Sequence, residues 1–186
     1  MQNIKIIEAI EESIKAKKGL NPEAIGEAAK IISGTLKDGG KVLIAGNGGS
    51  AADSQHFAAE LIGRFMKERR SLPAIALTTD TSVLTAWSND YSFDSLFERQ
   101  LEGIGAKGDI FIGISTSGNS KNIILAIQKA KRMGIKTVCL LGKDGGKLKG
   151  MSDAEIIVRH NETPRIQEAH ITALHIIAGI IEEENS

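Results

Sequence analysis

The sequence is poor in cysteine and has no long apolar run. Cys139 is the only cysteine among 186 residues, so no disulfide forms within the chain, as suits the cytoplasm, where we expect the protein. It lies in the apolar run 137–141, which predicts a buried strand thiol and not a nucleophile. No apolar stretch is long enough to cross a bilayer, and the first residues lack a signal-peptide core. We therefore expect no membrane partner.

The chain also lacks an excess of charge of either sign. The 23 Lys and Arg residues balance the 23 Asp and Glu residues, giving a formal net charge of +0. This balance argues against the broad basic surface of a nucleic-acid-binding protein. With 41% apolar and 25% charged residues, the composition is that of an ordered globular domain. Residues 1–186 contain no repeat or linker, so we expect one domain.

Helical and strand patterns follow one another along the chain. Helical spacing of apolar residues predicts two N-terminal helices, at 3–18 and 22–37, with Asn21 and Pro22 as cap and first-turn residues. Apolar runs then predict strands at 41–45, 73–78, 109–114, 136–141 and 154–158. Helices are expected between them at 51–66, 80–88, 93–104, 119–132 and 164–184. This alternation predicts an α/β fold, an open parallel five-stranded sheet flanked by helices in a flavodoxin-like order. Residues 1–38 would pack on this core or on a neighbouring subunit.

A hydroxyl-rich turn, Gly113–Ser120, joins a predicted strand to a predicted helix. The helix start offers unpaired N–H groups and a positive dipole end, which suit a phosphate group. Hydroxyl donors would come from Ser115, Thr116, Ser117 and Ser120. The lysine of the nucleotide-triphosphate P-loop is absent, which favours a small phosphorylated molecule. The alternative is a turn whose serines serve only as helix caps.

A second turn, Gly46–Ser50, follows the first predicted strand. Its glycines allow backbone amides to approach a ligand closely. The dinucleotide fingerprint is not present, because position 51 is Ala. Two such turns, each at the carboxyl end of a strand, predict ligands along one edge of a parallel sheet.

His56 and Glu60 are four residues apart in the helix after the glycine turn. This spacing puts imidazole and carboxylate on one helix face, about 40° apart around the axis. The two side chains could share a metal ion or divide acid and base roles. The alternative is an ordinary surface pair.

Three of the four histidines lie between positions 160 and 175. Gln167 and His175 are separated by roughly 12 Å along the last helix and about 80° around it. They could face one cavity only if it runs along the helix. His175 has apolar neighbours, so we expect it to be largely buried. His170 lies about 140° around the axis from His175, and we expect a structural or interfacial role for it.

Together these motifs resemble the SIS (sugar isomerase) domain family, and within it the phosphoheptose isomerases. The resemblance covers about residues 2–183. It rests on the two turns, on His56–Glu60, on Asn89–Asp90, on Gly142–Gly146 and on Arg165–Glu168. It implies conversion of sedoheptulose 7-phosphate to D-glycero-D-manno-heptose 7-phosphate through an enediol, the first step of ADP- or GDP-heptose biosynthesis. The heptose would feed lipopolysaccharide, capsule or another glycoconjugate.

The resemblance also implies roles for particular residues. Phosphate would be held by Ser115, Thr116, Ser117 and Ser120. Other substrate contacts would come from Asn47, Gly48, Gly49, Glu60, Asn89, Asp90 and Gln167. One zinc ion per subunit would be bound by His56, Glu60, Gln167 and His175. Glu60 would be the base and His175 the acid, in a homotetramer with active sites at subunit interfaces.

Two further SIS functions are alternatives. One is a non-catalytic scaffold that binds the bacterial replication initiator; by the resemblance it lacks the acid and the imidazole that stand here at Glu60 and His175. The other is a sugar-phosphate-sensing regulator, which adds a DNA-binding domain. Two local features stay open. Before Arg165 the chain has Asn161–Pro164, where some relatives carry a further acidic residue. Arg64 could pair with Glu60 or contact phosphate from a neighbouring subunit.

Overall fold

A computed structural model describes residues 2–185, and Met1 and Ser186, the ends of the predicted domain, lie outside the described residues. The helices are α1 (Gln2–Lys18), α2 (Pro22–Lys37), α3 (Gly49–Ile62), α4 (Thr81–Asp90), α5 (Leu96–Ile104), α6 (Lys121–Arg132) and α7 (Thr163–Asn185). The strands are β1 (Val42–Gly46), β2 (Ala74–Ala76), β3 (Ile110–Ser115), β4 (Lys136–Gly142) and β5 (Ala154–Val158). Short 3-10 turns cover Phe93–Ser95 and Gly146–Leu148.

The five strands form one sheet in the order β2-β1-β3-β4-β5, and all neighbours are parallel. This is the flavodoxin-like order, so the predicted fold class is confirmed. The order reverses between β1 and β3, where Gly46 is in register with Ile114. In such sheets a crevice opens at this reversal, outside the carboxyl ends of the strands.

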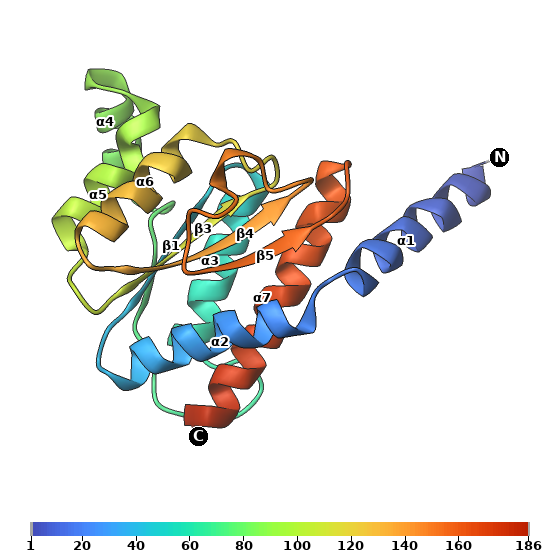
Figure 1. Cartoon of the computed structure of the whole chain (residues 1–186), viewed down its shortest axis with the longest axis horizontal. Helices are drawn as coiled ribbons and strands as arrows, with labels where there is room; N and C mark the ends of the chain where they lie inside the picture. Colours follow the sequence, from blue (N-terminus) through green and yellow to red (C-terminus); the bar gives the residue numbers. More distant parts are fainter. Residues whose placement is uncertain (1, 186) are drawn as a thin grey trace.

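Helices cover both faces of the sheet (Figure 1). Alternate side chains of β1 point to opposite faces: Val42 and Ile44 pack with α2, α3 and α7, whereas Leu43 and Ala45 pack with α5 and α6. The buried strand residues are almost all apolar, as expected for a sheet covered on both sides. Cys139 is fully buried on β4, as predicted.

Most element bounds fall close to the predicted ones, and two differ. Residues 93–104 are divided into a 3-10 turn, Phe93–Ser95, and the helix α5. The helix expected at 51–66 ends at Ile62, where the Gly63 N–H donates to the Ala59 carbonyl oxygen at 2.9 Å. The chain then leaves the helix axis, because the N–H groups of residues 65–67 donate to Glu182 on α7.

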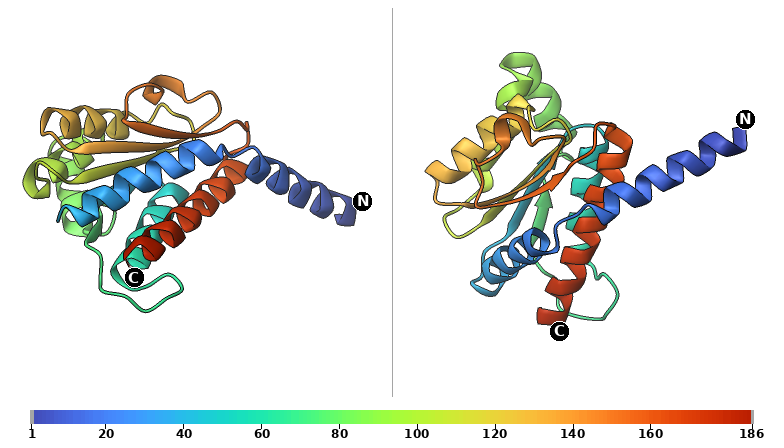
Figure 2. Two further views of the ribbon diagram at one scale, coloured as in Figure 1. Left: turned by 60° about the horizontal axis from the view of Figure 1, so that its bottom comes forward. Right: turned by 45° about the vertical axis from the view of Figure 1, so that its right-hand side comes forward.

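The first helix, α1, extends away from the body of the molecule (Figures 1 and 2). Its C-terminal part contacts the core, since Ala16 packs against Val158, Ile166 and Ala169. Further out, isoleucine side chains are 46–59% exposed, at Ile4, Ile7, Ile10 and Ile14. Within residues 2–185, none of the helices has the length and apolarity that a membrane span requires.

Candidate active site

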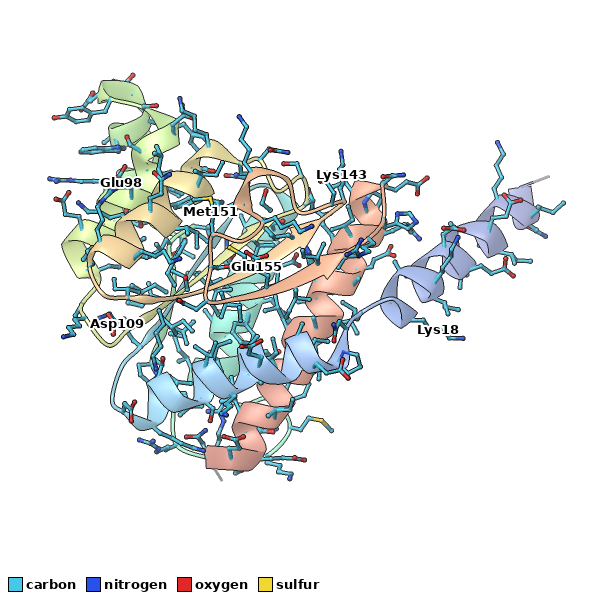
Figure 3. The ribbon with its side chains drawn as sticks, viewed as in Figure 1. Lys18, Glu98, Asp109, Lys143, Met151 and Glu155 are labelled. Atoms are coloured by element: carbon cyan, nitrogen blue, oxygen red, sulfur yellow. The ribbon has the colours of Figure 1, made fainter. Side chains whose placement is uncertain are left out.

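The glycine turn and the serine turn lie next to each other, because β1 and β3 are adjacent strands. Both turns are at the carboxyl edge of the sheet. In Figure 3 Lys143 marks that edge, after β4, and Asp109 marks the opposite edge, before β3. The two turns therefore lie together at one edge of the parallel sheet, as the sequence predicted, at the point where the strand order reverses.

Asn47 links the glycine turn to the first turn of α6. Its Nδ2 donates to Asn122 Oδ1 at 3.0 Å, and Asn122 Nδ2 donates back to Asn47 Oδ1 at 2.9 Å. Asn122 is buried and was missed by the sequence analysis. The signal available was its place in the first turn after the serines. This reciprocal amide pair fixes the distance between the two turns.

The serine turn is held internally by its own hydroxyls. Ser115 Oγ and Ser120 Oγ are 2.8 Å apart, and Ser117 Oγ accepts from the Asn119 N–H at 3.1 Å. Ser120 is the N-cap residue of α6, yet among the described residues its hydroxyl caps no N–H of that helix. The capping interpretation therefore does not explain Ser120.

The start of α7 lies against the glycine turn. A Cβ added at Gly49 would be 2.3 Å from Gln167 Nε2, so only glycine lets this amide approach so closely. Further along the same pair of helices, His56 of α3 meets His175 of α7. The two contacts follow in the same order along both helices, so α3 and α7 run side by side in the same direction (Figure 1). A cavity shared by Gln167 and His175 would therefore have to run along this helix pair.

Three side chains that could bind a metal ion converge where α3 meets α7. His56 Nε2 lies 3.2 Å from Glu60 Oε1 and 2.8 Å from His175 Nε2, and the ligand atoms of the three residues all lie within 4.8 Å of one another. Two imidazoles and one carboxylate are the protein ligands of many catalytic zinc sites, which keep a fourth position open. The residues present thus fit a zinc ion.

His175 is partly buried, less deeply than its neighbours Leu174 and Ile177. It lies on the stripe of α7 that faces His56 and the loop after α3, and not on the stripe that enters the core. All three converging residues belong to one chain. Convergence therefore does not require a subunit interface.

Asp53 extends this constellation and was missed by the sequence analysis, although it precedes His56 by three residues on the same helix face. Burial raises the pKa of the Asp53 carboxyl to about 6, against the opposing attraction of His56. Its Oδ2 is buried without a hydrogen-bond partner in residues 2–185.

Other candidate residues lie apart from the converging side chains. Asn89 and Asp90 are exposed at the end of α4, on the other face of the sheet, and Asn89 Nδ2 donates to Asp90 Oδ1 at 2.9 Å. Arg64 Nε pairs with Glu68 Oε1 at 3.0 Å, and no ion pair with Glu60 is formed among the described residues. His170 is fully buried, with Nε2 3.0 Å from the Leu141 carbonyl oxygen, as expected for a structural histidine.

Comparison with known proteins agrees with this geometry. Residues 5–142 match the SIS domain family. A phosphoheptose isomerase of Aliarcobacter butzleri is 57% identical over 164 residues, covering 88% of this chain and 87% of that protein.

Solved structures give the same result for the whole fold. A phosphoheptose isomerase structure from Neisseria gonorrhoeae has a TM-score of 0.91 and 42% identity, covering 98% of this chain and 100% of that one. A phosphoheptose isomerase structure from Francisella tularensis has a TM-score of 0.93 and 39% identity, covering 98% and 99%. The chain belongs to the SIS domain family and, within it, to the phosphoheptose isomerases.

Proposed function

We propose that the protein converts sedoheptulose 7-phosphate to D-glycero-D-manno-heptose 7-phosphate, the first step of ADP- or GDP-heptose biosynthesis. The observation that carries this function is the convergence of His56, Glu60 and His175 beside two turns that suit a sugar phosphate. The scaffold alternative is not favoured, because by the resemblance it lacks the acid and the imidazole that stand here at Glu60 and His175.

The reaction moves one proton between neighbouring carbons. Glu60 takes the proton from C1 of the ketose, while His175 gives a proton to the carbonyl oxygen at C2, which forms the enediol. Glu60 then returns the proton to C2, and His175 takes the proton from the oxygen on C1, which becomes the aldehyde. No atom or electron is gained or lost. Glu60 is 20% exposed at its side chain, so it keeps access to a bound substrate.

His56, Glu60, Gln167 and His175 would hold one zinc ion per subunit. When bound, zinc would polarise the substrate carbonyl and stabilise negative charge on the enediolate oxygens. Gln167 lies with its amide against Gly49, on the same side of α7 as the glycine turn. The support for zinc is the donor set of two imidazoles and a carboxylate.

Substrate binding is assigned to both turns. Ser115, Thr116, Ser117 and Ser120 would hold the phosphate group, and Asn47, Gly48 and Gly49 would contact the sugar chain. Asn89 and Asp90 would complete a site of a neighbouring subunit in a homotetramer, which agrees with their exposure at the end of α4. The phosphorylated substrate class fits a cytoplasmic enzyme.

Turnover of sedoheptulose 7-phosphate by purified protein tests this function. Glu60→Gln keeps the side-chain shape and removes the base, so we expect kcat to fall about 10²- to 10⁴-fold. The matched control is Glu27→Gln on the exposed side of α2, which should keep the parental rate. Near-normal turnover by Glu60→Gln would remove Glu60 from the reaction.

Metal dependence is tested by chelation followed by dialysis. We expect activity to be lost and to return on addition of zinc, with about one metal ion per chain by elemental analysis. Full activity in metal-free protein would leave Glu60 and His175 as plain base and acid. No turnover at all by the parent, with or without zinc, would return the scaffold to first place.

A further inference from the structure

The backbone of the loop between α3 and β2, residues 63–73, is bonded to α7 through the carboxylate of Glu182. Glu182 Oε1 accepts from the Phe65 N–H at 2.9 Å, and Oε2 accepts from the N–H groups of Met66 and Lys67 at 2.8 Å each. Figures 1 and 2 show this loop passing beside the C-terminal end of α7. The side chain of Glu182 is 2% exposed, and a buried carboxylate needs such partners. The bonds therefore fix the backbone path of the loop.

Arg69 connects the same anchor to the end of α3. Its side chain is 1% exposed, and its Nε lies 3.6 Å from Glu182 Oε1. Nη2 donates to the backbone carbonyl oxygen of Glu60 at 2.6 Å, and Nη1 donates to that of Leu61 at 2.9 Å. The last carbonyls of a helix lack partners within the helix, and a cation there is favourable. Arg69 thus holds the backbone of the residue assigned as the base.

Phe65 connects the loop to His175. The two rings are stacked, with centroids 5.7 Å apart and planes 27° apart. His175, Gly179 and Glu182 share one stripe of α7, because they are spaced by four and then three residues. A Cβ added at Gly179 would lie 3.6 Å from Phe65 Cε1, so the phenyl ring lies over this glycine and against the imidazole. The His175 ring is held between Phe65 and His56.

We propose that Glu182 and Arg69 are positioning residues: they hold the 63–73 loop so that Phe65 orients His175 and Arg69 orients Glu60. The effect of this positioning on turnover rests on the proposed function, whereas its effect on the orientation of the His175 ring does not. A buried ion pair adds little net stability over an apolar pair of the same size, so its contribution here is geometric. Misplacing a catalytic side chain slows the chemical step while substrate binding at the two turns is kept.

The test uses two variants with a matched neighbour for each. Phe65→Leu removes the stacked ring, and Glu182→Gln removes the charged anchor. The controls are Met66→Leu, at a residue that is 74% exposed, and Glu183→Gln. The exposed Glu183 carboxylate makes only a long ion pair with Lys67 Nζ, at 3.9 Å, and an exposed pair of this kind contributes little. Phe65→Tyr keeps an aromatic ring and should behave as the parent.

The first readout is NMR of the histidine rings in metal-free protein. The chain has 4 histidines, so each signal can be assigned by substitution. We expect the His175 signals to move in Phe65→Leu and in Glu182→Gln, while those of His160 and His170 stay in place. The second readout is turnover: kcat should fall about tenfold or more, with KM changed by no more than about twofold.

The proposal would be overturned if Glu182→Gln had the same His175 signals and the same kcat as the parent. It would also be overturned if the variant changed KM and left kcat unaltered. If Glu182→Gln does not fold, Arg69→Lys tests the same anchor, because it keeps the charge and loses the paired donors to the α3 carbonyls. If the parent does not turn over sedoheptulose 7-phosphate, the proposed function fails. The His175 signals then still decide the positioning role.

Discussion

Ser120 stands at the N-cap of α6 with its hydroxyl directed to Ser115, and this detail separates the two interpretations of the serine turn. A serine retained for capping would accept from an N–H of the first helical turn. The hydroxyls of Ser115 and Ser120 instead bond to each other at 2.8 Å. Each can turn toward a bound anion, since a hydroxyl rotates to suit its partner.

We therefore expect Ser117→Ala and Ser120→Ala each to weaken sugar phosphate binding by about 1–2 kcal/mol, about 5- to 30-fold, through loss of a donor to a charged group. Titration calorimetry with the substrate or with inorganic phosphate measures this. Ser71→Ala, at an exposed site away from the turn, is the control. Unchanged affinity in both variants would return the turn to a structural role.

Local spacing could predict some of the site residues but not all of them. His56 and Glu60 share a helix face through their spacing alone, so that pair was open to prediction. The approach of His175 to His56, at 2.8 Å, depends on how two distant helices pack. Asp53 becomes notable through its burial, and Asn122 through its hydrogen bond to Asn47 in another segment.

His170 makes stability depend on pH. Burial lowers its pKa to about 4, below the ordinary value of 6.5, against a smaller opposing effect of the Leu141 carbonyl. The contribution of the neutral His170 ring to the unfolding free energy is complete above pH 6.5 and is lost as pH falls toward 4. The reason is that the unfolded chain then binds a proton that the folded chain does not.

We expect this single group to lower the unfolding free energy by about 2 kcal/mol between pH 7 and pH 5. Urea unfolding at both values measures it. His170→Gln keeps a donor for the Leu141 carbonyl, and in this variant the difference of about 2 kcal/mol between the two pH values should disappear. The comparison with the parent is needed because the Asp53 carboxyl, with its raised pKa, acts with the opposite sign as pH rises toward 6. An equal change of the unfolding free energy with pH in the parent and in His170→Gln would contradict the assignment of this change to His170.

At the scale of elements, periodicity and turn residues could predict every strand and nearly every helix end. Asn21 illustrates why: its side chain accepts from the N–H groups of Glu23 and Ala24, and Pro22 follows in the first turn. The end of α3 could not be predicted in this way. Residues 63–66 continue a helical pattern, but the N–H groups of Phe65 and Met66 donate to Glu182, which lies more than a hundred positions later.

Gly26 offers an element-scale prediction, because a Cβ there would meet no atom within 4 Å in the middle of α2. Gly26→Ala should raise the unfolding free energy by about 0.5–1 kcal/mol through helix propensity. Gly118→Ala should do the opposite, since φ is +65° and the new Cβ would lie 2.0 Å from the Gly145 carbonyl oxygen. Chemical denaturation measures both, and a destabilised Gly26→Ala would show that α2 has a further contact.

At the scale of the whole molecule, α1 is the feature that one chain does not explain. Its apolar residues, at helical spacing in the sequence, form a stripe that would be expected to pack against the core or a neighbouring subunit. In the structure the stripe is exposed, while the base of the helix is tied down by His160, whose Nε2 lies 3.0 Å from Glu12 Oε2. An exposed stripe of this kind marks an interaction surface.

We expect a homotetramer built through this stripe. Light scattering at micromolar concentration should give a mass about four times the 19.9 kDa of the chain. Ile10→Glu places a charge in the stripe and should dissociate the assembly, whereas Lys5→Gln on the opposite side of α1 should not. A fully active monomer would contradict the prediction.

The late position of α7 has a consequence for synthesis. This helix is the last element of the described chain, and it carries Gln167, His175 and Glu182 as well as core residues such as Leu174 and Ile177. On a translating ribosome all five strands emerge before it. A nascent or prematurely terminated chain therefore leaves part of one sheet face uncovered and lacks His175, the proposed acid. The completed core and, by the proposed function, the activity both wait for this last helix.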